Sequence, residues 1–552
     1  MCGINAFLGF QSVNCDHTIN INLIHRGPDQ LCHWCSEFAQ VDFFRLAVTG
    51  GKSGNAPVTS FNSRWTCFMN GEIYNFRSLS LERLGQCYES DTKVLVEGVA
   101  KLVLGFFKFL TGMFAGILVY NLEKRLYIFR DFFGEKPLFY AFSETGIHVS
   151  SEFRAVLSTM RDDFKLNRQA VLDYFRFGYV EEPNTFDERI KAFPKGTLLA
   201  YDQGSKSFRI EMDFSESNIG SVSLGGIVKQ ITNEVLASDV PQGFLLSGGL
   251  DSTTLLSLAS RKCLEWDMAF TLKGVGASNL KDLNGAKKFA RRIGIRHETV
   301  EISKREVISE LPNLVKALDQ PISDMSSFGY FRLFRSIHEK GLKVAQVGHG
   351  IDEMFWGYGW FNKLTSESDL KKERIFWNTP SDQSILLDKG FLEAENQGDY
   401  DLHPSDPYLR SESKFQRARA EICHSYLSHN GLSQIDRLAM FHSVEPRAAF
   451  SDFRLYQWSQ QHSTNEKDFE KRQFRNSLDH SWIKRLVRRK KRGFDIGMID
   501  YVNSSEFGSA YLSKINELRS YNLPLAPNLN EMTLGARQKY RLIVLSLWLQ
   551  SI

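Results

Sequence analysis

The chain has 552 residues, with 68 basic and 64 acidic side chains and a formal net charge of +4. This length exceeds what one hydrophobic core usually supports, so we expect two or three domains. The near balance of charge argues against a strongly steered nucleic-acid binder, and 42% hydrophobic residues without short repeats exclude fibrous and solenoid classes.

The cysteine count and the first residues predict a cellular compartment. Eight cysteines in a long chain, with no signal-peptide pattern at the start, favour reduced thiols and a cytoplasmic location. The stretch LVLGFFKFLTGMFAGILVY, residues 102–120, resembles a membrane span, but Lys108 would cost about 2.5–3.5 kcal/mol at the bilayer centre. We therefore expect a buried helix followed by a core strand. We also expect no membrane partner.

Residues 1 to about 200 contain short apolar runs separated by turn signals. WTCFMNGEIYNF and RLYIFRDFFGEKPLFYAF are typical of strands broken by Asn-Gly and Gly turns, so this half is predicted to be mainly β. Residues from about 203 to 223 lose apolar density and gain Ser, Gly and charge, which indicates a domain boundary or a surface connection. The later pattern of apolar strand, glycine turn and helix predicts an α/β domain with a parallel sheet.

The segment FLLSGGLDSTTLLSLAS, which begins at Phe244, predicts a phosphate site. A strand runs into Ser247-Gly248-Gly249, and a helix begins near Asp251. Glycines let backbone N–H groups approach an anion, and the positive helix N-terminus adds to this attraction. No Gly-Lys-Ser/Thr follows, so the loop is not the usual mononucleotide loop. A plain turn is the alternative from spacing alone.

The opening MCGINAF places a thiol beside the first residue. Removal of Met1 would give Cys2 a free α-amine, whose reference pKa of about 7.7–8.0 lets it accept the proton of its own thiol. One residue would then supply both nucleophile and base.

Several motifs recur in order along the chain. They are Cys2-Gly3-Ile4, HRGPDQ (25–30), RLAV (45–48), NGEIYN (70–75), SDTKVL (90–95), RDFFGEKPLFY (130–140), the Ser-Gly-Gly-Leu-Asp-Ser loop, SVEPRAAFSDFRL (443–455) and RRKKRGF (488–494). Together they resemble the glutamine-hydrolysing asparagine synthetase family. The resemblance implies an N-terminal-nucleophile (αββα sandwich) glutaminase domain, 1–203, of the class II glutamine amidotransferases. It also implies an α/β parallel-sheet adenylating synthetase domain of the ATP pyrophosphatase type, 223–552.

In such a glutaminase domain, Cys2 attacks the glutamine amide and releases ammonia. The resemblance implies that Asn70 and Gly71 donate to the tetrahedral oxyanion, Arg45 binds the substrate carboxylate, and Asn70, Glu72 and Asp91 also bind glutamine. Opposite charges at the two ends of the site would suit a zwitterion.

In the synthetase domain the resemblance implies ATP and Mg²⁺ as cofactors. The residues it places at ATP are Leu245, Ser247, Gly248, Gly249, Asp251, Ser252 and Gly348. Asp251 and Asp352 would hold Mg²⁺, which prefers carboxylate and phosphate oxygens. Lys491 matches a family lysine that stabilises charge on the phosphates.

The sequence departs from the family pattern at the acceptor motif. The string Val347-Gly348-His349-Gly350-Ile351-Asp352-Glu353 has His349 where the family has an acidic residue. Lys281-Asp282, Phe43 and the absence of a proline in 324–331 are further departures. His349 is a candidate proton acceptor for attacking ammonia, or else a packing residue, and it puts aspartate in doubt as the acceptor.

The predicted activity is ATP-driven, glutamine-dependent amidation of a carboxylate, with aspartate to asparagine as the family reaction. The alternatives are amidation of another acid such as a sugar uronate or natural-product acid, adenylation of a tRNA base, and a non-catalytic binding protein. We expect small-molecule substrates and no nucleic-acid partner. A homodimer is one of the oligomeric states that the sequence leaves open.

Two further groups of residues are interpreted as structural rather than functional. The basic segment 484–492 is expected to be a solvated helix face rather than a nucleic-acid patch. Cys32 and Cys35 have metal-like spacing, but one such pair is half a zinc site, so packing is expected.

Overall fold

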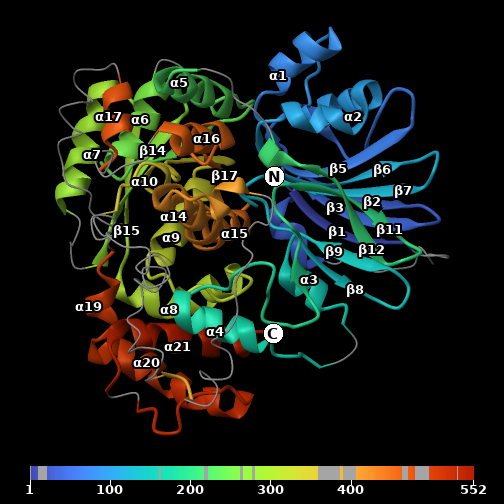
Figure 1. Ribbon diagram of the computed structural model, residues 1–552. Coiled ribbons are helices and arrows are strands. Elements are labelled where there is room, and N and C mark those ends of the chain that lie inside the picture. The colour runs from blue at the N-terminus through green and yellow to red at the C-terminus, as the bar shows by residue number, and fades with distance from the viewer. Residues whose placement is uncertain are drawn as a thin grey trace.

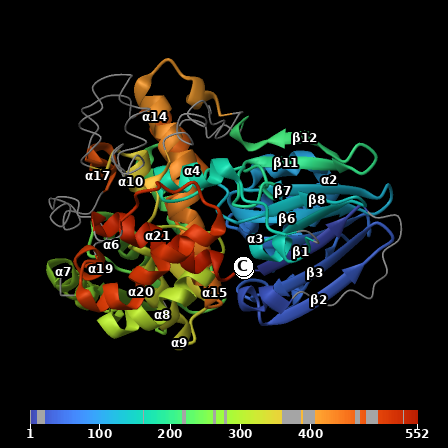
Figure 2. The same cartoon turned by 90° about the horizontal axis from the view of Figure 1, so that it is seen from below.

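The computed structural model describes residues 2–9, 21–160, 163–216, 222–260, 265–275, 280–358, 386–388, 406–462, 470–478, 496–530 and 533–552. A β sandwich lies on one side of the molecule and a helix-rich domain on the other, in both views (Figure 1, Figure 2). Lys491 and the basic segment 484–492 lie outside the described residues.

Two six-stranded sheets form the sandwich. The first contains, in spatial order, β10 (Lys191–Ala192), β8 (Phe139–Phe142), β9 (Ile147–Ser150), β1 (Cys2–Leu8), β3 (Ala39–Arg45) and β2 (Gln30–Cys35). The second contains β12 (Ser207–Asp213), β11 (Thr197–Asp202), β7 (Arg125–Arg130), β6 (Gly112–Tyr120), β5 (Trp65–Ile73) and β4 (Val58–Thr59). Because β12 pairs with β11, the sandwich extends past residue 203 into the segment expected to be a connection.

Strand alternation creates two apolar layers in the sandwich. Phe68 and Ile117 face the first sheet and pack with Ile4, whereas Cys67 and Leu118 face the opposite way, toward helix α2 (Asp91–Leu102). The alternation follows from the two-residue period of a strand. The other helical segments of this half are η1 (Ile21–Arg26), η2 (Gly51–Gly54), α1 (Phe76–Leu79), η3 (Ser80–Leu84), η4 (Val103–Phe109), α3 (Phe153–Leu157), α4 (Arg168–Phe177) and η5 (Phe214–Glu216).

The apolar stretch 102–120 forms a short helix and a core strand as predicted, but only Phe106 and Phe107 of the helix are buried. The helix is the 3-10 segment η4, and the strand is the buried β6 in the middle of its sheet. Across the described ranges, no helix is long and apolar enough to cross a membrane.

The expected turn at Asn70-Gly71 is wrong. β5 continues without a break from Trp65 to Ile73, and Gly71 pairs with Phe114 of β6. Gly71 has φ +131°, and a Cβ atom there would lie 2.0 Å from the Met113 carbonyl oxygen. The glycine is therefore required for close backbone approach inside a sheet, not for a reversal.

The C-terminal half is built on a five-stranded parallel sheet. Its order is β15 (Arg296–Glu301), β14 (Met268–Lys273), β13 (Gln242–Leu245), β16 (Val344–Val347) and β17 (Glu445–Ala448). In chain order this is 3-2-1-4-5, a doubly wound arrangement whose order reverses between β13 and β16. Ligands of such sheets bind outside the strand ends at this reversal. The two-domain fold class is confirmed.

Helices surround this sheet (Figure 1). The described helical segments of this half are α5 (Leu224–Val235), α6 (Leu250–Ala259), α7 (Leu280–Ile293), α8 (Lys304–Ala317), α9 (Ser327–Glu339), α10 (Ile351–Met354), η8 (Pro407–Arg410), α14 (Lys414–Ile422), the π-helix η9 (Cys423–Leu432), α15 (Ser433–Phe441), α16 (Phe453–His462), α17 (Arg472–Ser477), α19 (Met498–Val502), α20 (Ser505–Glu517), η11 (Leu518–Tyr521) and α21 (Ala536–Leu549). In Figure 1 the N-terminus lies where the two halves meet.

The cysteine expectations are met only in part. Cys35 is disulfide-bonded, so the prediction of reduced thiols is wrong at this position, whereas Cys2, Cys32, Cys67, Cys87 and Cys423 are free. Cys32 packs at the margin of the cluster between the sheets. Among the residues described here, no group of three or more potential ligands could hold a metal ion, and packing remains the interpretation of Cys32.

Truncation of the sandwich core tests this layering. Ile117 is fully buried between the sheets, whereas Ile210 on β12 is 64% exposed. Ile117→Ala should lower the free energy of unfolding by about 2–5 kcal/mol, and Ile210→Ala should change it by no more than about 0.5 kcal/mol. Urea unfolding followed by intrinsic fluorescence gives both values. Equal transition midpoints for the two variants would contradict the assigned layers.

Candidate active site

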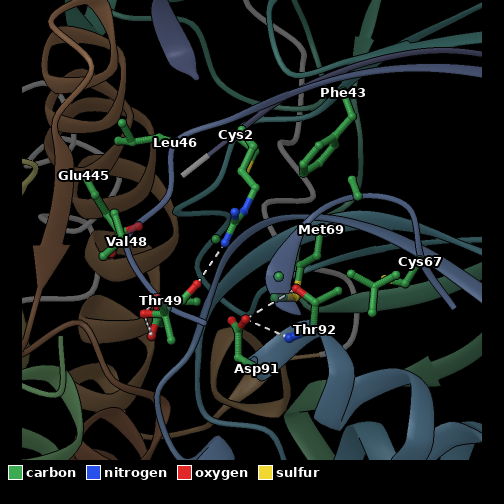
Figure 3. Close-up of a pocket in the computed structure, with 16 residues that line it drawn as sticks. Cys2, Phe43, Leu46, Val48, Thr49, Cys67, Met69, Asp91, Thr92 and Glu445 are labelled. Carbon is green, nitrogen blue, oxygen red and sulfur yellow. Dashed lines mark hydrogen bonds between the residues drawn. The ribbon is translucent and has the colours of Figure 1, made fainter. Parts of the chain in front are cut away.

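The first candidate site is a pocket at the start of β1. Its lining includes five residues expected from the sequence, Cys2, Arg45, Gly71, Glu72 and Asp91, and also Glu445 from the other half of the chain. Figure 3 shows Cys2, Thr49, Asp91 and Glu445 around this pocket. The residues meet because β1 and β3 are paired with Cys2 opposite Arg45, while β5 of the second sheet carries Gly71 and Glu72.

Asn70 lies directly beside Cys2. The backbone nitrogen of Cys2 donates to Asn70 Oδ1 at 2.9 Å. The Nδ2 group of the same amide is buried and has no hydrogen-bond partner within the described parts of the chain. Buried donors are rarely left unsatisfied. An unused donor next to a thiol is what a site for a developing oxyanion requires.

The Cys2 thiol is buried, and burial raises its pKa, while the nearby Arg45 guanidinium opposes the shift. The thiol is therefore protonated at neutral pH and needs a proton acceptor before it can act as a nucleophile.

The charged ends of the pocket are held by loop contacts. Arg45 donates from Nη1 to Asn55 Oδ1 at 2.7 Å and from Nη2 to the Thr49 carbonyl at 3.0 Å. Glu72 accepts from Thr49 Oγ1 at 2.8 Å. Asp91 accepts from the Ile73 backbone N–H at 3.0 Å. Burial raises the pKa of both Glu72 and Asp91, and nearby carboxylates add to the shift. This end of the pocket therefore favours a cationic group.

Arg447 of β17 reaches the same acidic end and was missed by sequence reasoning. Its Nη2 lies 3.2 Å from Glu72 Oε2, and its Nε donates to Glu445 at 2.6 Å. The motif containing both residues was recognised, but nothing in its spacing places it in a pocket with Cys2.

The second candidate site lies at the reversal of the parallel sheet. Ser247, Gly248 and Gly249 follow β13, which ends at Leu245, and lead into the N-terminus of α6. Gly248 has φ +76°, and a Cβ atom there would lie 2.6 Å from the Asp282 carbonyl oxygen. Glycine is therefore required here for the close approach of the loop to the Asp282 backbone, and the anion site predicted from the sequence stays a prediction.

The loop after β16 lies against the loop after β13. A Cβ atom at Gly348 would lie 3.0 Å from the Ser252 backbone nitrogen. His349 follows, with its Nε2 3.5 Å from the Tyr330 hydroxyl and its ring near Gly431 of the π-helix. The expected ATP loop and the expected acceptor motif are thus neighbours.

Lys471 joins the two carboxylates expected to hold Mg²⁺. Its ammonium lies 2.6 Å from Asp251 Oδ2 and 2.6 Å from Asp352 Oδ1. Burial lowers the pKa of Lys471, but the two carboxylates outweigh burial and raise it, so the group is charged. Because Asp251 and Asp352 both lie close to the Lys471 ammonium, the two carboxylates are close to each other. Such a pair would suit Mg²⁺, with phosphate and water oxygens as its other ligands. Sequence reasoning missed Lys471, because it precedes α17 with no recognised motif.

Comparison with known proteins follows the same division. The family model described as asparagine synthase matches residues 225–522, and that described as a glutamine amidotransferase domain matches residues 1–211. Glutamine-hydrolyzing asparagine synthetase 1 of Bacillus subtilis (strain 168) is 29% identical over 63% of this chain and 56% of the relative. Asparagine synthetase 2 of Oryza sativa subsp. japonica is 27% identical over 68% and 62%, and asparagine synthetase 3 of the same Bacillus strain is 27% identical over 83% and 81%.

The aligned region spans less than two thirds of the first two relatives. The asparagine synthase match nevertheless covers more than half of this chain, and the amidotransferase match covers the sandwich. The chain therefore belongs to the asparagine synthase family, with a glutamine amidotransferase domain preceding the synthase domain.

Proposed function

We propose that the protein is an ATP-driven, glutamine-dependent amidotransferase that activates a carboxylic acid as its adenylate and converts it to the amide. Aspartate to asparagine is the favoured reaction. The observation that carries the proposal is the pocket at Cys2, where a thiol and oppositely charged ends line a space suited to glutamine, and Asn70, with its unused amide donor, contacts the Cys2 backbone.

Glutamine hydrolysis is assigned to the first site. After removal of Met1, the Cys2 amine takes the thiol proton, and the sulfur attacks the side-chain amide carbon. Asn70 Nδ2 and the Gly71 backbone N–H donate to the oxyanion. Arg45 pairs with the substrate carboxylate. Glu72 and Asp91 accept from the ammonium group. The Cys2 ammonium group returns its proton to the leaving nitrogen as the C–N bond breaks, so ammonia leaves, and water hydrolyses the thioester to restore the thiol.

Adenylation is assigned to the second site. The backbone of Ser247–Ser252, with Leu245 and Gly348 beside it, holds ATP. Asp251 and Asp352 would hold Mg²⁺, which when bound neutralises part of the phosphate charge. Lys471 adds positive charge at the same place, and Lys491 remains a proposed phosphate contact.

Ammonia then attacks the activated carbon, and His349 is the proposed proton acceptor. Its imidazole lies between Tyr330 and Gly431, without the acidic group that the family pattern has at this position. An imidazole does not attract the α-ammonium of aspartate, so amidation of an acid without that ammonium, such as a uronate, is the second candidate.

The acceptor is tested with purified protein, ATP, Mg²⁺ and glutamine, to which aspartate or a hexuronic acid is added. Aspartate should increase pyrophosphate release and yield asparagine detectable by mass spectrometry. Pyrophosphate and amide from the uronic acid alone would select the second candidate. Failure of any acid to stimulate pyrophosphate release, with glutamine or with ammonium chloride, would reject adenylation.

Asn70→Ala should lower kcat for glutamine hydrolysis by about 10²- to 10³-fold, because a preorganised oxyanion donor is lost. Synthesis from ammonium chloride should be unchanged. Asn121→Ala is the matched control, since Asn121 Nδ2 donates to the Ser63 carbonyl in an exposed turn. A loss of less than about threefold, measured by glutamate release, would argue against the assigned donor.

Lys471→Met should lower pyrophosphate release by at least about tenfold with either nitrogen source, because charge stabilisation at the phosphates is lost. Glutamine hydrolysis should continue. Lys273→Met is the control, because Lys273 pairs with Glu301 at 2.7 Å on a partly exposed surface. Equal rates for the two variants would remove Lys471 from the site.

A further inference from the structure

Strand β17 connects the two candidate sites physically. Glu445, its first residue, lines the pocket that contains Cys2. Ala448, its last residue, is paired with Val347, the first residue of the acceptor motif. Just beyond the strand, the Phe450 carbonyl oxygen lies so close to Gly350 that a Cβ there would be 2.2 Å from it. One short strand therefore touches the glutamine pocket at one end and the acceptor loop at the other.

Arg447, in the middle of this strand, is fully buried and held by both halves of the chain. Its Nη1 donates to the Val235 and Ala237 carbonyls at 2.8 and 2.7 Å, and its Nε donates to Glu445 at 2.6 Å. Its Nη2 faces Glu72 at 3.2 Å. The Nε and Nη1 hydrogen bonds fix the guanidinium plane, and Nη2 meets Glu72 as an ion pair rather than as a hydrogen bond, so a movement of Glu72 changes the charge that faces Arg447.

The acidic end of the pocket gathers three carboxyl groups around the guanidinium of Arg447. Glu72, Asp91 and Glu445 are all buried there beside Arg447. Buried carboxylates without a nearby cation are costly. An arriving ammonium group would therefore share Glu72 with Arg447 and change the balance of forces on that side chain.

Building on the proposed function, we infer that Arg447 and Glu445 are positioning residues for glutamine. They hold Glu72 where it can accept from the substrate ammonium, and they couple occupancy of the glutamine pocket to the acceptor loop through β17. The strand is packed at both ends, and Ser451 beyond it donates to Glu135 of the sandwich at 3.0 Å. A shift at Arg447 is therefore transmitted to the contact with Gly350 rather than absorbed.

The positioning role is tested with Arg447→Lys, which keeps the charge but loses the fork, and Glu445→Gln, which keeps the shape but loses the charge. Each should raise KM for glutamine hydrolysis by about tenfold or more, while kcat and synthesis from ammonium chloride stay within about twofold of the unmodified enzyme. Arg454→Lys is the control, because Arg454 pairs with Asp452 and Glu234 outside the pocket. It should leave KM unchanged.

A merely structural role for Arg447 predicts a different result. Both variants would then lose hydrolysis and ammonia-dependent synthesis in parallel, with a lowered melting temperature, and this outcome would overturn the inference. An unchanged KM in both variants would overturn it as well.

The coupling is tested by measuring KM for glutamine hydrolysis with and without Mg²⁺ and α,β-methylene-ATP plus aspartate. The nucleotide and acid should change KM by about threefold or more in the unmodified enzyme, and Arg447→Lys should abolish this change, since linkage between sites is reciprocal. An unchanged KM in the unmodified enzyme, or a change that survives in Arg447→Lys, would contradict coupling through β17. Failure of the proposed function would be seen separately, because ATP would then release no pyrophosphate when ammonium chloride replaces glutamine as the nitrogen source.

Discussion

A buried ionic contact between the two halves of the chain fixes their relative position. Asp436 of α15 accepts from Arg26 Nη2 at 2.8 Å and from Lys136 Nζ at 3.0 Å, and all three side chains are fully buried. Separating the halves would leave these charges unpaired in an apolar setting, at a cost of about 3–5 kcal/mol when one partner is removed. The halves are therefore held in a single arrangement, and both candidate sites depend on it.

The same buried contact extends to Cys2, the proposed nucleophile. Arg26 Nε also donates to the Cys2 carbonyl at 3.2 Å, so the residue that contacts Asp436 helps to order the start of β1. Chain ends are poorly ordered unless something holds them. Here pairing with β3, the Asn70 amide and Arg26 hold Cys2 in place, while Glu445 from the second half closes the pocket. The proposed glutamine site is thus lined by residues of both halves, although its expected residues all lie in the first 91 positions.

Local sequence predicted the parts of this molecule that local chemistry determines. The Ser247–Ser252 loop and the parallel sheet around it follow from strand, glycine and helix patterns, and Cys2 was singled out by its position. The glycine at 71 misled the prediction, because a strand that needs close backbone approach uses the same dipeptide as a turn. Lys471 and Arg447 could not be placed from sequence, because each meets carboxylates more than 100 residues away, and only the fold brings them together.

The central claim is that the Cys2 thiol releases ammonia from glutamine for use at a separate adenylating site on the same chain. The most direct measurement compares Cys2→Ala with the unmodified enzyme, supplied with either glutamine or ammonium chloride at saturating ATP. The account predicts that amide formation from glutamine disappears, while amide formation from ammonium chloride continues at an unchanged rate. Amide formation from glutamine that survives the loss of this thiol would contradict the account.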